Sequence, residues 1–567
     1  MKALIFFMLL ALSVRADKPN FLFIAVDDMR PDLNCYGNSM IHSPNIDSLA
    51  QKGVLFKRAY VNIAVCNPSR ASMMTGLYPD SIKVWDLRVH FREAYPEVIT
   101  LPQHLRKHGY YAVGMGKVYH NPTPDPQSWS EAVQYPKGVK NAYTKKVREE
   151  IKAADKALPQ GHHYKGNLRG AAASPNVNED INTWDGAQTE VAVQTLKRLA
   201  QKKEPFFMAM GYVRPHLPFV APKKYWDLYN RDKIPLAKNR FMPQNGYPQG
   251  IGSNYEMRHY YDMMNFPKPA DGEVSPEIAR KLLHGYYACI SQVDALIGRL
   301  LKTLKEEGLE DNTVIIFWSD HGWKLGEHNG WSKMTNHEID TRIPMIVYDP
   351  RAKAKGQQSN CLVESVDIFP TVCELAGIPQ ANGLEGKSFK KLLDEPDSEF
   401  KDAVFSQFIQ PYQRKPHMGY AVRTENYRYI EWRDIKTGKI SFQEIYDQKK
   451  DPQENKNIYD SADQNLKEQL QKRLHQWNKP KKMDLTPVVR SIQNGPRCEV
   501  KVKNTLKTVV DIYHINHIGA RKRVAKLQPG TATVINSYTG HAFVIEAIDG
   551  TLHRIIYAGY PKTEIEL

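Results

Sequence analysis

The chain of 567 residues is poor in cysteine, with six in all, and has no long apolar run after its first dozen residues. Six scattered cysteines are too few for a disulfide scaffold, and their spacing matches no common zinc motif. Without about 18 uninterrupted apolar residues, no later segment is expected to cross a bilayer. The sequence also lacks internal repeats and low-complexity tracts. Hydrophobic residues make up 41% and charged residues 25%, which is typical of a globular protein and excludes a wholly disordered or collagen-like chain.

Acidic residues are outnumbered, since 62 Asp and Glu stand against 78 Lys and Arg and the formal net charge is +16. Such an excess favours an anionic partner through electrostatic steering. The sequence contains no recognised nucleic-acid-binding motif, so nucleic acid is not the partner we expect.

The first 16 residues have the pattern of a secretory signal peptide. Lys2 precedes an apolar run at 3–12, and small or medium residues stand at Val14 and Ala16. The run is too short to span a bilayer as a helix. We therefore expect a secreted or periplasmic protein, although the same residues could instead form a buried N-terminal element.

Apolar strands alternate with helical patterns along most of the chain. Continuous apolar runs occupy 20–26, 206–213, 313–318 and 343–348. Helical periodicity occupies 46–52, 101–108, 188–202 and 276–307. This alternation predicts an α/β fold, with a mostly parallel sheet sandwiched by helices. In such sheets ligands bind at the carboxyl ends of strands, where Asp27, Asp28, Asp320 and His321 stand.

At about 100 to 200 residues per domain, a chain of this length is expected to form two to four folded units, and changes in composition suggest their bounds. We expect a catalytic domain at 17–395, a smaller α+β subdomain at 396–485 and an all-β sandwich module at 486–567. Within the first, 135–175 is weakly periodic, and 230–273 is rich in Asn, Gly, Pro, Met and Tyr. Long irregular insertions of this kind are usually functional loops or mobile segments. In the second, strands are expected at 419–432 and 441–446, and a helix at 462–477.

Residues 65–76, VCNPSRASMMTG, contain the most informative local pattern. Asn67 is a good helix N-cap and Pro68 suits a first helical turn, which would place Cys66 at a helix N-terminus. Backbone N–H groups there favour anions, and Arg70 adds a fixed cation one turn later. Cys66 is therefore a candidate nucleophile in an anion pocket. The alternative is a buried structural cysteine at a helix start.

These residues resemble the maturation motif of the type I sulfatases. The resemblance covers much of 19–480 and includes, in order, VDDMRPDLNCYGN, SPNIDSLAQKGVLF, VCNPSRASMMTGLYPD, GKVYH, GYVRPHLPF, SDHGWKLGEH and VDIFPTVCELAGIP. Among the branches of the alkaline-phosphatase superfamily, the iduronate-2-sulfatase branch is the one that the motif sequences GKVYH, PHLPF and DHGWKLGEHNGWSK most resemble. The resemblance implies a hydrolase of sulfate esters with an alkaline-phosphatase-like fold.

The resemblance also implies a modified residue and a metal ion. In the family, the cysteine matching Cys66 is oxidised to Cα-formylglycine by a formylglycine-generating enzyme or a radical maturase. Its hydrate, a gem-diol, is the nucleophile, and its second hydroxyl expels the sulfate. One Ca²⁺ would be held by position 66 and by the residues matching the family's ligands, which are Asp27, Asp28, Asp320 and His321. Carboxylates suit Ca²⁺, whereas an imidazole is an unusual ligand for it. Taken alone, Asp27 and Asp28 could be a polar loop.

By the same resemblance, five further residues complete the catalytic set. They are Arg70, Lys117, His120, His216 and Lys333. Lys117 would hold the diol and a sulfate oxygen, and Lys333 would clamp a sulfate oxygen. His216 would protonate the leaving alcohol, while His120 would take the proton as the sulfated diol collapses. Taken singly, each histidine could be structural and each lysine could be a surface charge.

Residues that would recognise the rest of the substrate are less clearly marked. Trp323, His328 and Trp331 could frame a sugar ring or pack in the core beside the site. Arg88, His90 and Arg92 could meet a uronate carboxylate or form a solvated basic strand. The branch resemblance implies a 2-O-sulfated uronic acid or a related sugar in an acidic glycan.

Two other functions stay open on the sequence. One is a phosphonate or phosphodiester hydrolase of the same superfamily, and the other is a catalytically inactive glycan-binding protein.

At 527–545, LQPGTATVINSYTGHAFVI resembles the β-domain of the von Hippel–Lindau protein. There the residues matching Ser537 and His541 help bind hydroxyproline. Because Val524 and Phe543 depart from that pattern, a structural or glycan-tethering role is the favoured alternative.

Overall fold

The structure is a computed structural model that describes 18–87, 89–120, 124–137, 143–160, 162, 164–166, 168–176, 179–412, 415–481, 483, 497–515, 521–538, 541–548, 553–557 and 562–567. The expected signal peptide lies outside the described residues, as does Arg88. Structural statements below concern the described residues.

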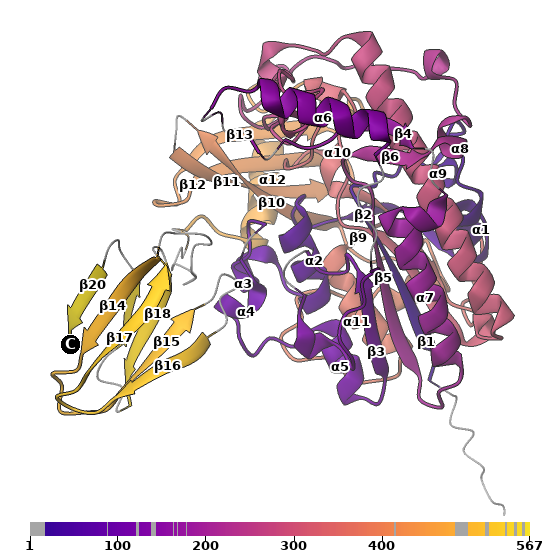
Figure 1. Ribbon diagram of the computed structural model, residues 1–567. Coiled ribbons are helices and arrows are strands. Elements are labelled where there is room, and N and C mark those ends of the chain that lie inside the picture. Colours follow the sequence, from indigo (N-terminus) through magenta and orange to yellow (C-terminus); the bar gives the residue numbers. More distant parts are fainter. Residues whose placement is uncertain are drawn as a thin grey trace, which may run out of the picture.

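A seven-stranded sheet forms the centre of the larger part of the molecule (Figure 1). In spatial order its strands are β3 (Tyr111–Gly116), β5 (Phe206–Pro215), β1 (Asn20–Asp27), β7 (Thr313–Ser319), β8 (Arg342–Tyr348), β2 (Val54–Tyr60) and β9 (Gln358–Glu364). All neighbours pair in parallel except β8, which is antiparallel to β7 and to β2. The predicted mostly parallel sheet is confirmed.

Helices cover both faces of this sheet (Figure 1). One layer contains α1 (Pro44–Lys52), α7 (Trp184–Ala200) and α9 (Pro276–Glu306), and the other contains α2 (Cys66–Thr75), α5 (Leu101–Lys107) and α11 (Ile368–Leu375). Strand β1 shows why two layers are needed, since Leu22 and Ile24 enter one apolar core and Phe21 and Phe23 enter the other. A strand buried on both faces reads as a continuous apolar run, which is how the sequence signalled it.

Shorter elements decorate the sheet. They are α3 (Pro79–Ile82), α4 (Phe91–Ala94), α6 (Lys145–Ala157), α8 (Lys223–Trp226), α10 (Glu338–Thr341), β4 (Ala173–Asn176) and β6 (Phe219–Pro222). Helix α6 corrects the expectation that 135–175 is irregular. Of its 13 residues only Val147 is buried, and Val147 and Ile151, one turn apart, pack in a small apolar cluster. This short apolar stripe among many charged residues was not recognised in the sequence. The insertion at 230–273 is irregular as expected, with only short 3₁₀ turns.

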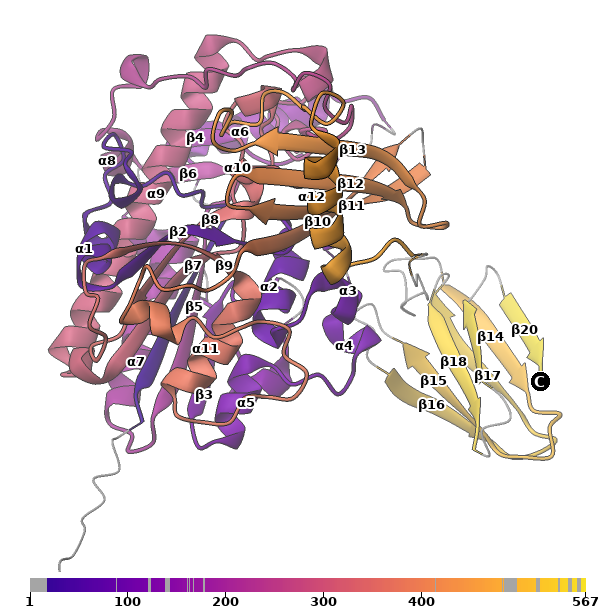
Figure 2. The same cartoon turned by 180° about the vertical axis from the view of Figure 1, so that it is seen from behind.

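A second, antiparallel sheet follows, with the order β10 (Ala403–Tyr412), β11 (Lys415–Thr424), β12 (Tyr427–Asp434) and β13 (Ile440–Asp447). Helix α12 (Gln464–Trp477) packs against it through Leu470 and Leu474 (Figure 2). The single strand expected at 419–432 is a hairpin of β11 and β12, because Glu425 and Asn426 make a turn inside it. Strand β10 was not predicted.

The last part of the chain forms two further sheets (Figure 2). One has the order β17 (Ala532–Tyr538), β14 (Arg497–Lys503) and β20 (Lys562–Glu566), and the other has β16 (Arg521–Leu527), β15 (Val510–Ile515), β18 (Ala542–Ala547) and β19 (His553–Tyr557). Val500 from the first and Ile545 from the second share one apolar core, so the expected small β-sandwich is present. The domain boundaries at 395 and 485 stay predictions.

Two features of the sequence have a direct counterpart in the structure. All six cysteines lie within the described residues, and each is a free thiol. Among the helices that the structure describes, none is both long and apolar enough to cross a membrane.

Candidate active site

The predicted site residues meet where four parallel strands end. Asp27 ends β1 and is followed by Asp28, while Asp320 follows β7 directly. Lys117 comes directly after β3, and His216 comes directly after β5. Because parallel neighbours end at one edge of the sheet, residues far apart in sequence become neighbours there.

Two glycines let the ends of β3 and β5 come close. A Cβ on Gly211 would lie 2.1 Å from the carbonyl carbon of Lys117, and one on Gly116 would lie 2.2 Å from the carbonyl oxygen of Gly211. Gly116 also has a φ of +66°, which glycine adopts readily. The Lys117 N–H donates to the Gly211 carbonyl over 2.9 Å, so this close approach directly sets the position of Lys117.

Cys66 is the first residue of α2, as expected, and the whole helix is buried. The N-cap, however, is Val65 and not Asn67, because Asn67 lies inside the helix. The Asn67 amide instead donates to the carbonyls of Asp86 and Val89, over 2.9 and 2.7 Å. Burial, followed by the charge of Asp27, raises the pKa of the Cys66 thiol well above its usual value. At neutral pH an unmodified Cys66 is therefore a neutral thiol.

Arg70 forms ion pairs with two of the carboxylates, Asp27 and Asp320. Its guanidinium donates to Oδ2 of Asp320 over 2.8 Å and lies 3.3 Å from Oδ1 of Asp27. It also donates to the carbonyl of Lys117. All three side chains of this ion-pair network are fully buried. A planar fork with several fixed donors can hold such an arrangement, which a single ammonium cannot.

Two lysines from distant parts of the chain, Lys117 and Lys333, bring positive charge to the surroundings of Cys66. Lys117 pairs with Asp27, and its Nζ lies 3.9 Å from the Cys66 sulfur. Lys333 Nζ lies 3.1 Å from Asp28. The surrounding carboxylates overcome the effect of burial and raise the pKa of both lysines, so both ammonium groups stay charged.

The carboxylates form a cluster that suits a cation. Ligand atoms of Asp27, Cys66, Asp320 and His321 all lie within 4.8 Å of one another. Burial, opposed by Arg70 and reinforced by Asp27, raises the pKa of Asp320 to about 7, and burial also raises the pKa of Asp28. Raised pKa values mean that the protein groups alone do not compensate these negative charges. A divalent cation would supply that compensation, and hard carboxylate oxygens are the donors that Ca²⁺ prefers.

The three histidines differ in their surroundings. His321 Nε2 lies 3.3 Å from the Cys66 sulfur, and its Nδ1 lies 3.3 Å from Asp28. His216 Nε2 lies 3.9 Å from Asp28. Burial, followed by the charge of Lys117, lowers the pKa of His120 to about 3, and burial with the charge of Lys333 lowers that of His216 to about 4.

One acidic residue of the site was not predicted. Glu256, from the irregular insertion at 230–273, places Oε1 3.2 Å from His216 Nε2 and Oε2 3.1 Å from Lys333 Nζ. No motif marks this residue, and the only signal in the sequence was the length of the irregular insertion that contains it.

The two tryptophans expected to frame a sugar ring do not do so. Trp323 and Trp331 are 0% and 1% exposed and belong to the main apolar core. Trp323 lies under the site, with Lys333 Nζ 4.7 Å from its ring centre. Neither indole presents an open face, so this prediction is wrong, and the core-packing alternative holds.

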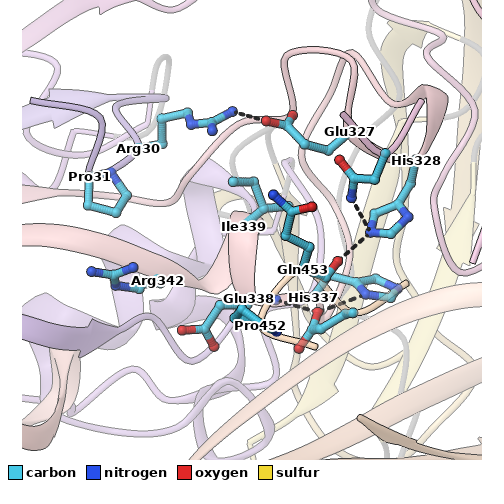
Figure 3. A pocket seen from close by; sticks show the side chains of 12 residues that line it. Arg30, Pro31, Glu327, His328, His337, Glu338, Ile339, Arg342, Pro452 and Gln453 are labelled. Atoms are coloured by element: carbon cyan, nitrogen blue, oxygen red, sulfur yellow. Dashed lines mark hydrogen bonds and ion pairs between the residues drawn. The ribbon is translucent and has the colours of Figure 1, made fainter. Parts of the chain in front are cut away.

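The predicted role of His328 in sugar binding stays a prediction. The residue is buried and lines a cavity of about 150 Å³, where Figure 3 shows it and His337 on the side opposite Arg30 and Arg342. Its Nε2 lies 2.8 Å from the carbonyl oxygen of Gln453 (Figure 3). This cavity has no predicted catalytic residue in its lining. The histidine therefore joins the catalytic part of the chain to the loop after β13.

His90 and Arg92, which the structure describes, have structural contacts. Nδ1 of His90 accepts from the Arg92 N–H over 3.1 Å and caps α4. Arg92 forms a forked pair with Asp125, with both distances 2.7 Å.

In the C-terminal module, Ser537 Oγ lies 3.0 Å from His541 Nδ1, and Phe543 is buried. The resemblance of this module to the von Hippel–Lindau β-domain stays a prediction.

Comparisons with known proteins agree with this geometry. Residues 19–378 match the family model described as Sulfatase, and 326–480 match N-sulphoglucosamine sulphohydrolase, C-terminal. The chain is 32% identical over 522 residues to iduronate 2-sulfatase of Homo sapiens, covering 79% of this chain and 92% of the relative.

Two solved structures share the fold. A protein in complex with its substrate D-glucosamine-2-N,6-O-disulfate matches with a TM-score of 0.62 and 23% identity, over 83% of this chain and 99% of its own. The phosphonate monoester hydrolase of Agrobacterium radiobacter matches with 0.60 and 22%, over 81% and 95%. The expected fold class is thereby confirmed.

Proposed function

The chain belongs to the sulfatase family, and from that premise we propose that it is an exported enzyme that removes 2-O-sulfate from uronic acid residues of an acidic glycan. Its activity is the hydrolysis of sulfate esters, and sulfated glycans are the substrate class. The finer substrate is supported by the iduronate 2-sulfatase relatives and by the excess of basic residues.

One observation supports the catalytic centre above all others. Buried cations approach the Cys66 end of α2 from separate parts of the chain, with Lys117 Nζ 3.9 Å from the sulfur and Arg70 one helical turn away. A transferring sulfuryl group carries negative charge on its oxygens, and fixed cations in a buried site stabilise that charge without reorganising.

We assign the metal to Asp27, Asp28, Asp320 and His321, together with position 66. These residues fit a divalent cation, because burial raises the pKa of the Asp28 and Asp320 carboxyls, whose charge is left uncompensated. For Asp27, burial is outweighed by neighbouring positive charges, Lys117 foremost, which lower the pKa, so that carboxylate is ionised and can bind the ion. A bound Ca²⁺ would supply Lewis acidity toward an oxygen at position 66. Arg70 orients Asp27 and Asp320 and so keeps the carboxylates in place for the ion.

We further propose that Cys66 is converted to formylglycine by a formylglycine-generating enzyme or a radical maturase. The raised thiol pKa supports this step, since an unmodified Cys66 is a poor nucleophile in this buried position. Lys117 would then contact the modified side chain and one sulfate oxygen, and Lys333 another oxygen. His216 would give its proton to the leaving oxygen, while His120 would accept a proton from position 66.

Cys66→Ala and Cys66→Ser variants test this assignment. Sulfate release from a 2-O-sulfated uronate oligosaccharide is expected to fall by more than about 10⁴-fold for both, while thermal unfolding stays close to the wild type. Intact-peptide mass after co-expression with a maturase should show the aldehyde at position 66. A Cys66→Ala protein that still releases sulfate would contradict the nucleophile.

The same assay separates the other candidate functions. A phosphonate or phosphodiester hydrolase would cleave 4-nitrophenyl phenylphosphonate faster than any sulfate ester. An inactive glycan-binding protein would keep an unmodified thiol and cleave neither. Export is tested by N-terminal sequencing of the protein from the medium or periplasm, which should begin near Asp17.

A further inference from the structure

Glu256 directs both oxygens of one carboxylate at two side chains of the site. It precedes a 3₁₀ turn at Met257–His259, and its side chain is only 12% exposed. Oε1 lies 3.2 Å from His216 Nε2, and Oε2 lies 3.1 Å from Lys333 Nζ. Arg169, at the rim, is farther away, with Nη1 4.0 Å from Oε1.

Sulfate binding alone does not explain this carboxylate. Lys333 is already paired with Asp28 at 3.1 Å, so Glu256 is a second anion on one ammonium. Burial raises the pKa of Glu256, but Lys333 and then His216 outweigh burial and lower it to about 2, so the group is ionised. An ionised carboxylate beside a sulfate pocket repels the substrate. Its presence is explained if it holds the two side chains that it contacts.

The ring of His216 shows what that contact determines. Its Nδ1 lies 2.7 Å from the carbonyl oxygen of Leu217. A carbonyl only accepts, so Nδ1 carries a hydrogen, and Nε2 is the nitrogen left to exchange a proton. Glu256 is the acceptor beside Nε2, and the two contacts together fix the rotation of the ring.

We propose that Glu256 is a positioning residue that aims Nε2 of His216 at the leaving oxygen and holds Lys333 beside Asp28. The inference rests on the proposed function. The step uses the protonated ring, a minor form at neutral pH, whose charge the Glu256 carboxylate 3.2 Å from Nε2 stabilises. As the S–O ester bond breaks, its electron pair goes to the leaving oxygen, which takes the proton from Nε2. The ring becomes neutral, and Glu256 remains a carboxylate throughout.

A pair of substrates separates the two effects of Glu256. A sugar sulfate has a poor alcohol leaving group that needs the proton of His216, whereas 4-nitrophenyl sulfate releases an acidic phenol that does not. Lys333 would contact the sulfate of both. In the matured, metal-loaded enzyme, Glu256→Gln should lower kcat/KM about 100-fold on the sugar sulfate and only about 5-fold on the aryl sulfate.

Three further variants make the comparison specific. Glu273→Gln, in the same insertion, removes a half-exposed partner of Arg240 and should leave both substrates unaffected. In a His216→Ala background, Glu256→Gln should no longer change the ratio between the substrates. Glu256→Asp keeps the charge and should recover part of the ratio. If thermal unfolding shows that Glu256→Gln does not fold, Glu256→Asp serves as the test, with a smaller shift in the same direction.

The proposal is overturned if each folded Glu256 variant loses activity equally on the two substrates, so that the ratio of their kcat/KM values stays at the wild-type value. The wild-type enzyme is measured first. If it releases sulfate from neither substrate, the proposed function itself fails. A wild type active on both, with no shift in the ratio on changing Glu256, would refute the positioning role alone.

Discussion

The strand ends and the insertion at 230–273 bring charged side chains to the same place by different means. At the strand ends, β1 is paired in parallel with β5 on one side and β7 on the other, so Asp27 and Asp320 are placed by backbone ladders. The insertion has no strand or long helix and delivers Glu256 from a chain with only 3₁₀ turns. Its path depends on side-chain hydrogen bonds to other loops and on two isolated backbone bridges, from Gln244 to Lys456 and from Tyr260 to Arg169.

This difference suggests a division of labour. The residues at or directly after the strand ends include every proposed metal ligand except position 66, and these must stay fixed for the chemistry. Among the predicted catalytic residues, the insertion forms ion pairs with His216 and Lys333, both through the Glu256 carboxylate. Changes at the strand ends should therefore reduce all activity, while changes in the insertion should alter how substrates are ranked.

Arg70→Lys should have the largest effect, because it removes the fork that holds two carboxylates at the strand ends. A lysine keeps the charge but cannot donate to Asp27, Asp320 and the Lys117 carbonyl together. We expect kcat/KM to fall about 100-fold or more on every sulfate ester, and stability to fall by about 3 kcal/mol. Steady-state kinetics and urea unfolding measure the two effects.

Arg92→Lys is the matched control for Arg70→Lys. Arg92 also forms a forked carboxylate pair, but with Asp125 and away from the strand ends. It should lose stability while kcat/KM stays within about 2-fold of the wild type. A large loss of activity in Arg92→Lys would instead favour the uronate-binding role that the sequence left open.

Gly211→Ala should have the next largest effect. The added Cβ would lie 2.1 Å from the Lys117 carbonyl carbon, so β3 and Lys117 must move. We expect a loss of about 3 kcal/mol in stability and at least about 10-fold in kcat. In the insertion, a Cβ on Gly250 would lie 3.1 Å from the Tyr247 carbonyl oxygen, and Gly250→Ala should cost less than about 1 kcal/mol. Similar losses for both would remove the contrast between the regions.

The sequence predicted the strand-end half of the site because each strand carries its own signal. A run such as NFLFIAV followed by Asp27 states both that a strand is buried and where it ends. Chain topology then brings the ends together, and no side-chain detail is needed. The antiparallel direction of β8 and the existence of β10 could not be read in this way, since pairing partners are chosen by the whole fold.

Other residues were misjudged because sequence does not show which way a side chain faces. Trp323 and Trp331 stand in a motif next to site residues, yet both enter the core. Asn67 is a common N-cap residue, but its amide satisfies two loop carbonyls instead. Glu256 could not be predicted as a site residue, because an irregular loop has no periodicity from which the positions of its side chains could be inferred.

Asn254→Ala should have the smallest effect of the three, and it tests how the insertion is held. Asn254 is fully buried, accepts from the Trp331 N–H over 2.8 Å and donates to the Asn329 carbonyl over 3.0 Å. Both partners precede Lys333 in the same loop, so Asn254 ties the loop of Glu256 to the loop of Lys333. Its removal leaves buried backbone groups unpaired and should cost about 1 to 3 kcal/mol.

On activity, Asn254→Ala should resemble a weak form of Glu256→Gln. We expect kcat/KM to fall about 10-fold on a sugar sulfate and to change little on 4-nitrophenyl sulfate, because a misplaced Glu256 releases the ring of His216. Asn254→Asp keeps the acceptor for Trp331 and loses the donors, so it should lie between the wild type and Asn254→Ala. Calcium affinity, measured by calorimetry, should not change, since the metal ligands belong to the strand ends. A fall in affinity would mean that the two regions are not separate, and that the insertion helps to hold the carboxylates as well.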